Sequence, residues 1–346
     1  MRKMFRFLAV ICVFARVFSV FCYKSVSANA VSKVNAYSKA ECVMEVNSRR
    51  ILYEERGDIR LPMASTTKIL TCITVLNLCD DLDKEFEIPI EAVGIEGSSV
   101  YLKTGDRYSV RDLLYGLMLR SGNDCATALA LYCSSSIEEF TTQMNGTAQK
   151  AGAINSYFKN PHGLPCDGHY TTARDLALIT CYAMQNATFC EIVSTAYYKP
   201  RAWKNKNKML ALYDGAIGVK TGYTKEAGRC LVSAAKRDNM TLVCVTLGCP
   251  MTYERSMELF DDAFKAYSLQ TLLQEGDMVK TQDGTLCGKT RVSFSYPLLE
   301  EEKALVKIVA KPVTNSKNRR KNQEITGQFE IYLAKRLLFS GNLYKL

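Results

Sequence analysis

The first third of the chain contains a segment in which apolar residues repeat at helical spacing. Residues 66–80 lack glycine and proline, and their apolar positions include Ile69, Leu70, Ile73, Val75 and Leu76. Side chains at positions i, i+4 and i+7 share one face of a helix, so this pattern predicts a helix with its apolar face in the core. Pro62 precedes the segment, which places Ser65 at the first helical turn, where hydroxyl residues are favoured.

A second helical pattern runs through residues 110–119, where leucines and a methionine repeat at the same spacing. The apolar, alanine-rich residues 125–132 follow it. Between the two segments stands the tripeptide Ser121-Gly122-Asn123, and glycine and asparagine are typical of turns. The pattern therefore predicts two buried helices joined by a tight junction at these three residues.

Strand patterns dominate the remainder of the chain. Residues 216–224, 230–235 and 241–247 are rich in β-branched residues and predict strands. We expect residues 31–267 to form an α/β (α+β) domain, in which an antiparallel sheet drawn from both ends of the segment is flanked by a helical subdomain. Short β-rich runs at 286–294, 304–309 and 329–338 predict a small C-terminal β domain over residues 268–346.

The amino-terminal segment predicts export. Three basic residues within the first six positions precede an apolar run at 7–15, and small residues ending at Ala30 fit a cleavage site. We therefore expect a signal peptide over residues 1–30 and action outside the cytoplasmic membrane. Arg16 interrupts the apolar run, which argues against a stable membrane-spanning helix.

Net charge and cysteine content change this interpretation little. The net charge is +10, of which five positive charges lie in the leader, and a basic remainder suits an anionic wall. The basic stretch 317–321 is expected to be a solvated hairpin loop, and no other motif supports a nucleic-acid partner. Outside the leader the count of cysteines is even, which permits disulfides, but Cys72, Cys181, Cys230 and Cys244 lie in apolar patterns that favour free thiols.

Ser65 and Lys68 form the first candidate for chemistry. The two side chains lie three residues apart and share one helix face. A lysine at the start of a helix faces the positive end of the helix dipole, and burial would lower its pKa further. A neutral Lys68 could remove the hydroxyl proton of Ser65 and so activate a nucleophile. The alternative is that Ser65 is only an N-cap.

Two further motifs follow in order. Ser121 could pass a proton to a leaving amine, and Asn123 could bind the substrate amide or Lys68. In the predicted strand at 216–224, Lys220 and Thr221 would hold a substrate carboxylate, with help from Thr224, and Gly222 would let a substrate backbone approach closely. Each motif alone is weak, because turns, strand ends and surfaces commonly carry such residues.

Each motif also recurs elsewhere in the chain. The additional S-x-x-K matches are 156–159, in an expected loop, and 233–236, in an expected strand that runs into a turn. A second S-G-N at 340–342 predicts a hairpin turn, and a second K-T-G at 103–105 precedes Ser121 and lacks the later threonine. Order and context therefore select the set that begins at Ser65.

These three motifs resemble those of low-molecular-mass penicillin-binding proteins of the serine-type D-alanyl-D-alanine carboxypeptidase family. Further similar segments are residues 39–58, 160–164, 169–177, 205–210, 296–300 and 327–333. The resemblance implies a β-lactamase/transpeptidase-like fold with an opening hairpin at 39–58. It also implies that Ser65 attacks the bond between two D-alanines of a peptidoglycan stem peptide, leaving an acyl-enzyme that water hydrolyses.

The same resemblance implies further roles. The backbone N–H groups of Ser65 and Tyr223 would form an oxyanion hole, and β-lactams would acylate Ser65 as covalent inhibitors. Family members often end in an amphipathic anchor, whereas this chain stops at Leu346 after a strand-like segment. We expect no such anchor, which leaves open release, tethering by an uncleaved leader, and peripheral association with the membrane or wall.

Three alternatives remain at this point. A non-catalytic wall-binding or β-lactam-sensing protein could use the same scaffold. A class A β-lactamase would need a glutamate to activate the deacylating water, and none stands between Glu139 and Glu191. A Ser-His-Asp hydrolase is disfavoured because His162 and His169 lie in a glycine- and proline-containing loop, where we expect structural hydrogen bonds. No motif predicts a metal or cofactor.

Overall fold

The computed structural model describes residues 38–312 and 325–345. The predicted signal peptide over residues 1–30 and the predicted loop at 317–321 lie outside the described residues. The three motifs that begin at Ser65, Ser121 and Lys220 all fall within the described part of the chain.

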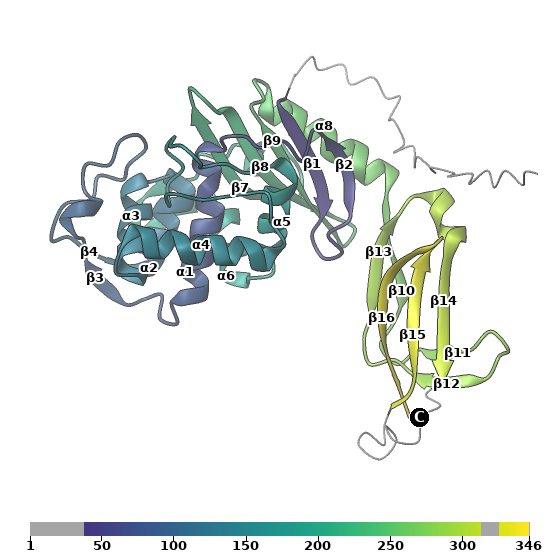
Figure 1. Cartoon of the computed structure of the whole chain (residues 1–346). Coiled ribbons are helices and arrows are strands. Elements are labelled where there is room, and N and C mark those ends of the chain that lie inside the picture. The colour runs from purple at the N-terminus through teal and green to yellow at the C-terminus, as the bar shows by residue number, and fades with distance from the viewer. Residues whose placement is uncertain (1–37, 313–324, 346) are drawn as a thin grey trace, which may run out of the picture. The chain divides into compact units, whose positions relative to one another are not determined.

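A five-stranded antiparallel sheet forms the framework of the first part of the chain (Figure 1). Its order is β2-β1-β9-β8-β7, with bounds β1 Ala40–Glu45, β2 Ile51–Glu55, β7 Ala216–Thr224, β8 Gly228–Arg237 and β9 Met240–Leu247. The expected sheet from both ends of the segment, with the opening hairpin, is confirmed. Strand β7 lies at the sheet edge.

Helices cover one face of this sheet. They are α1 Lys68–Leu78, α2 Val110–Tyr115, α3 Asn123–Cys133, α4 Ile137–Ala151, α5 Ala173–Ala183 and α6 Ala187–Ser194. Helix α1 packs against α3, α4 and α5, and all its residues from Lys68 to Val75 are buried. The predicted apolar repeat thus places α1 at the centre of the helical cluster, with Lys68 at its first position.

The helix starts differ in how they are capped. Ser109, Ser136, Thr172 and Asn186 each accept a hydrogen bond from a backbone N–H in the first turn of α2, α4, α5 and α6. Helix α1 has no side-chain cap, and a 3₁₀ turn, Ala64–Thr67, precedes it. Because Ser65 caps no helix, the alternative of a purely capping serine loses its basis.

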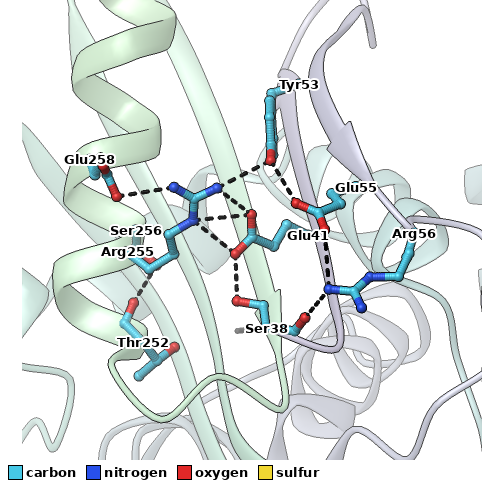
Figure 2. A network of polar contacts seen from close by, with 9 residues as sticks. All are labelled: Ser38, Glu41, Tyr53, Glu55, Arg56, Thr252, Arg255, Ser256 and Glu258. Carbon is cyan, nitrogen blue, oxygen red and sulfur yellow. Dashed lines mark hydrogen bonds and ion pairs between the residues drawn. The ribbon is translucent and has the colours of Figure 1, made fainter. Parts of the chain in front are cut away.

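Helix α8, Thr252–Ala266, packs against β8 and β9 and begins beside a buried ion pair. Figure 2 shows Arg255 of α8 facing Glu41 of β1, with Glu258 and Tyr53 around the guanidinium. The Arg255 Nη2 to Glu41 Oε2 distance is 2.8 Å and the Nε to Oε1 distance is 2.9 Å. These charge-assisted hydrogen bonds hold the start of α8 against β1.

Short elements connect these layers. They are β3 Glu85–Glu87, β4 Arg107–Ser109, β5 Tyr197–Tyr198, β6 Trp203–Lys204 and α7 Met209–Leu212, with 3₁₀ turns at Ile90–Ala92 and Lys199–Arg201. Within the described ranges no single helix is long and apolar enough to cross a membrane. The helices α5 and α6, which are bent by 109° relative to each other, are together long and apolar enough by length and composition alone.

The C-terminal part is β-rich. One sheet has the order β11-β12-β16-β15-β14, with bounds β11 Met278–Lys280, β12 Leu286–Lys289, β14 Val306–Pro312, β15 Ile325–Leu333 and β16 Arg336–Tyr344. In a second, two-stranded sheet, β10 Ser268–Leu273 pairs with β13 Phe294–Leu298. A 3₁₀ turn, Glu300–Leu305, precedes β14. Phe329, Ile331 and Leu343 are fully buried in a separate core. A C-terminal β domain was therefore a correct expectation of fold class.

One local prediction in this region was wrong. The S-G-N copy at 340–342 is not a hairpin turn but lies within β16. A Cβ on Gly341 would stand 2.8 Å from the ring of Phe329, so the glycine makes room for a core aromatic side chain. The β-rich run 329–338 contains the end of β15, at Leu333, and the start of β16, and the chain reverses around Ala334.

Candidate active site

Ser65 and Lys68 are in direct contact. Lys68 Nζ lies 2.9 Å from Ser65 Oγ, 2.6 Å from Asn123 Oδ1 and 2.6 Å from the His162 carbonyl oxygen. The Lys68 side chain is fully buried, and burial, reinforced by the positive charge of Lys220, holds its pKa well below the usual lysine value. The amine is thus poised to be neutral.

The three oxygens around Lys68 match the hydrogen-bonding capacity of a neutral amine. Such an amine has two N–H groups and one lone pair. Asn123 Oδ1 and the His162 carbonyl oxygen only accept, so they take both N–H groups. The lone pair then faces the Ser65 hydroxyl, whose O–H can donate to it. This arrangement prepares Ser65 for deprotonation.

The second motif occupies a strained junction. After α2 the chain forms a π-helical turn, Gly116–Arg120, and Ser121 then adopts a left-handed conformation with φ of 65°. This conformation is uncommon for a residue with a Cβ and is concentrated at functional sites. The turn directs Ser121 toward Lys220, whose Nζ lies 3.0 Å from Ser121 Oγ. The predicted junction between two buried helices is thereby present.

Lys220 approaches from the sheet. It lies on β7, is 1% exposed, and donates to Ser121 Oγ and, over 2.8 Å, to the Thr221 carbonyl oxygen. Burial, together with the nearby charge of Lys206, lowers its pKa to about 7. Near neutral pH Lys220 can therefore exist in either protonation state, and an anionic ligand would favour the charged form.

Gly222 serves a packing role that the sequence did not indicate. A Cβ there would lie 3.2 Å from Ser65 N and 3.0 Å from the Met63 carbonyl oxygen. The strand thus rests on the backbone of the turn that carries Ser65, and the absent side chain admits this turn. Tyr223 follows, with a 66% exposed side chain at the cavity.

A cavity of about 490 Å³ opens beside these residues. It is lined by Ser65, Ser98, Ser121, Lys206, Thr221, Gly222, Tyr223, Arg229, Cys230, Thr252 and Tyr253. Thr224 is absent from this lining, and its Oγ1 instead accepts a hydrogen bond of 3.0 Å from Ala227 N in the turn to β8. The structure therefore brings together Ser65, Lys68, Ser121, Asn123, Lys220, Thr221, Gly222 and Tyr223, and leaves the Thr224 hydroxyl aside.

Sequence reasoning missed several lining residues. Lys206 and Arg229 add positive charge to the same cavity as Thr221, and Lys206 Nζ contacts Ser98 Oγ at 3.3 Å. Tyr253 enters from the first turn of α8. Only Lys206 lay in a segment that the family resemblance had singled out, and nothing in the local sequence marks the other two. The added cations suit a substrate that ends in a carboxylate.

Both histidines have supporting positions. His169 Nε2 lies 3.0 Å from Thr67 Oγ1, and its Nδ1 accepts a 3.0 Å hydrogen bond from Lys159 N. Burial lowers the pKa of His169 to about 4 and that of His162 to about 3. Their contacts hold the 160–169 loop against the turn of Ser65, as the prediction of structural hydrogen bonding proposed. Among the described residues, no group of His, Cys, Asp or Glu is arranged to hold a metal ion.

Comparisons with known proteins point in one direction. Residues 26–251 match the family model described as D-alanyl-D-alanine carboxypeptidase. The chain is 32% identical over 256 residues to the D-alanyl-D-alanine carboxypeptidase DacF of Bacillus subtilis. This match covers 70% of the chain and 66% of DacF. It is 36% identical over 244 residues to the D-alanyl-D-alanine carboxypeptidase of Streptomyces sp. K15, covering 64% and 84%.

Solved structures share the architecture. Penicillin-binding protein 5 of Haemophilus influenzae superposes with a TM-score of 0.74 at 24% identity, over 91% of this chain and 98% of that one, which shows the fold. A mutant of the Streptomyces K15 DD-transpeptidase superposes with a TM-score of 0.63 at 34% identity. That match covers 67% of this chain and all of the Streptomyces chain.

Proposed function

Because the chain belongs to the D-alanyl-D-alanine carboxypeptidase family, we propose that it removes the terminal D-alanine from peptidoglycan stem pentapeptides through an acyl-enzyme on Ser65. The observation that carries this assignment is the Lys68 amine, which is buried among two acceptor oxygens and the Ser65 hydroxyl. The family acts on peptidoglycan outside the cytoplasm, which suits the predicted leader.

Acylation begins with proton transfer from Ser65 to Lys68. Ser65 Oγ then attacks the carbonyl carbon of the penultimate D-alanine, and negative charge develops on the carbonyl oxygen. The backbone N–H groups of Ser65 and Tyr223 would receive that charge. The contact of Gly222 with the Ser65 turn supports this pairing, because Tyr223 is the next residue along the strand. Each such donor is typically worth about 3–4 kcal/mol to the transition state.

Departure of D-alanine needs a proton on its nitrogen. Ser121 lies 3.0 Å from Lys220 Nζ and lines the same cavity as Ser65, so its hydroxyl can deliver that proton while it takes up the proton that Lys68 received from Ser65. Lys220 and Thr221 would hold the terminal carboxylate, with Lys206 and Arg229 adding positive potential. Thr224, at the end of β7, would help to hold the carboxylate, because its Oγ1 accepts from Ala227 N and its O–H can still donate.

Water then releases the shortened stem peptide. Lys68, neutral again once the proton has left with D-alanine, can activate that water as it activated Ser65. A β-lactam would acylate Ser65 in the same way and leave slowly. On the described part of the loop between α4 and α5, the group that meets Lys68 is a carbonyl oxygen rather than a glutamate, which argues against rapid β-lactam hydrolysis.

Labelling with a fluorescent penicillin, together with D-alanine release from a peptide ending in D-alanyl-D-alanine, tests the proposal. Ser65→Ala should lose both activities. Ser194→Ala, which alters an exposed hydroxyl on α6, should keep both. Labelling that persists in Ser65→Ala would refute the nucleophile. Labelling of the native protein without D-alanine release would instead indicate a sensor.

A further inference from the structure

Two half-buried cysteines meet at the far ends of the helices that carry the catalytic amine and its amide partner. Cys79 follows the last residue of α1, and Cys133 is the last residue of α3. Their Sγ atoms lie 3.2 Å apart although the residues are 54 positions apart in the chain. Among the cysteines in the described part of the chain, no other two sulfur atoms come into contact.

The environments of the other thiols set this pair apart. Eight of the described cysteines, including Cys72, Cys181, Cys230 and Cys244, are buried. Cys190 is half-buried and contacts Met184, and Cys166 is exposed beside Asn160. Among the described cysteines, only Cys79 and Cys133 combine partial exposure with contact to the sulfur of a second cysteine.

We propose that Cys79 and Cys133 are a disulfide-forming pair, which closes into a bond once the protein reaches an oxidising compartment. A disulfide has an S–S distance of about 2.05 Å, so closure needs a relative movement of only about 1 Å at two helix ends. The shared hydrogen bond lowers the pKa of the Cys79 thiol, whereas the pKa of Cys133 is raised by the same bond and by burial. Cys79 is therefore the first nucleophile.

The reaction is a thiol–disulfide exchange with an external disulfide, such as oxidised glutathione. The Cys79 thiolate attacks one sulfur of that disulfide, forms a mixed disulfide and releases one thiolate. Cys133 then loses its proton and attacks the Cys79 sulfur, releasing the second thiol. Two protein thiols are oxidised by two electrons, and one external disulfide is reduced to two thiols.

The bond would tie together two helices that already meet at their other ends. Lys68 opens α1 and Asn123 opens α3, and their side chains are 2.6 Å apart. Each helix has 11 residues and is therefore roughly 16 Å long. The disulfide would lie about that far from the catalytic amine. It would stabilise the helical cluster without touching the reacting groups, and so goes beyond the proposed acyl transfer.

Peptide mapping tests this directly on the native protein. The purified protein is equilibrated with oxidised glutathione, denatured in the presence of iodoacetamide, digested and analysed by mass spectrometry. We expect one cross-linked species that joins the peptides of Cys79 and Cys133, with Cys72, Cys181, Cys230 and Cys244 alkylated. Full alkylation of Cys79 and Cys133, or Cys79 found only as a glutathione adduct or joined to another cysteine, would overturn the proposal.

Thermal unfolding supplies an independent test, in which the Tm of each protein is compared between its oxidised and reduced forms. Oxidation should raise the Tm of the native protein by about 5–10 °C, because closing a long loop restricts the unfolded chain. Cys79→Ala and Cys133→Ala should lose that shift. Cys190→Ala, which removes another half-buried thiol, should retain it. A shift that survives in Cys79→Ala would contradict the assignment even if cross-linked peptides were found.

Discussion

At the scale of single residues, the decisive feature is a pair of buried lysines with depressed pKa values. Lys68 and Lys220 approach the cleft from a helix and a strand, and neither forms an ion pair among the described residues. Burial is the leading cause of both shifts, and each amine stands near another positive charge. This arrangement costs stability, which is common at sites where function needs a destabilised group.

The pKa of about 7 at Lys220 predicts a pH dependence. For a peptide with a free carboxylate, kcat/KM should fall about tenfold per pH unit above pH 7, because free enzyme loses the charge that attracts the carboxylate. The bound carboxylate favours charged Lys220, so kcat should remain level to higher pH. Protonation of Lys68 should produce a separate loss of activity on the acid side, since its pKa is depressed.

The Lys206→Gln variant tests the cause of the fall in kcat/KM above pH 7, the alkaline limb of the pH profile. Removing the Lys206 charge should move the limb in kcat/KM upward, because Lys206 is the second contribution to the low pKa of Lys220. Lys208→Gln, at an exposed position two residues away, should leave the limb in place. A limb at the same pH in kcat and kcat/KM would show that Lys220 is not the titrating group.

At the scale of elements, the site depends on the contact between β7 and the turn before α1. Gly222→Ala would place a Cβ 3.0–3.2 Å from backbone atoms of Met63, Ser65 and Thr66. Backbone atoms cannot swing aside as side chains do, so the strand must move away from the nucleophile.

We expect Gly222→Ala to lower kcat/KM by about tenfold, because the contacts require a shift of a few tenths of an ångström, and a displacement of about 1 Å costs about a hundredfold. Gly146→Ala in α4 is the matched control, since nothing lies within 4 Å of its added Cβ. It should stabilise the helix by about 0.5–1 kcal/mol and preserve turnover. Unchanged kcat/KM in Gly222→Ala would mean that the strand contact is dispensable.

The buried pair of Glu41 and Arg255 yields a prediction about the joint between β1 and α8 (Figure 2). Glu41→Gln leaves the Arg255 charge buried with less compensation, and should lower the free energy of unfolding by about 3 kcal/mol. Glu258→Gln removes a partner that is more exposed, and should cost about 1 kcal/mol or less.

Urea unfolding measures these losses, and a double-mutant cycle with Arg255→Met separates the pair from its surroundings. The combined variant should lose less stability than the sum of the two single variants, because no unpaired buried charge remains. Strict additivity would show that the two side chains do not depend on one another. Since Thr252 and Tyr253 line the cavity one turn before Arg255, the single variants should also raise KM.

At the scale of the whole molecule, the residues that we propose for catalysis all precede the C-terminal sheets. The structure of the Streptomyces K15 DD-transpeptidase is matched over its whole length by 67% of this chain. The C-terminal strands have their own core around Phe329 and Ile331, and the cavity lining contains no residue beyond Tyr253.

A chain that ends at Tyr267 should therefore keep its kcat/KM on a soluble D-alanyl-D-alanine peptide to within about threefold. We expect any defect to appear only with intact peptidoglycan as substrate. Circular dichroism and penicillin labelling would verify that the shortened protein is folded. A folded, labelled protein without peptide turnover would contradict the proposed division of roles.

The sequence by itself determined the reaction type. The three motifs that begin at Ser65, Ser121 and Lys220 contain the residue types that this reaction needs, and their order along the chain can be seen without the structure. It also predicted the central helix, since residues 66–80 lack glycine and proline and repeat apolar residues at helical spacing. That every residue from Lys68 to Val75 is buried, and not one face alone, came from the tertiary structure. Local context correctly discarded the copies at 156–159 and 233–236, which lie in a loop and in β8.

Only the tertiary structure decided which groups share the cleft and in what charge state. Lys68 meets Asn123 across 55 positions, and Lys220 meets Ser121 across 99, so no local pattern could specify these contacts. The pKa of the buried Lys68 amine is lowered because many distant segments together exclude water from it. The same reason explains why Arg229, Tyr253, the packing role of Gly222 and the meeting of Cys79 with Cys133 could not be deduced from neighbouring residues.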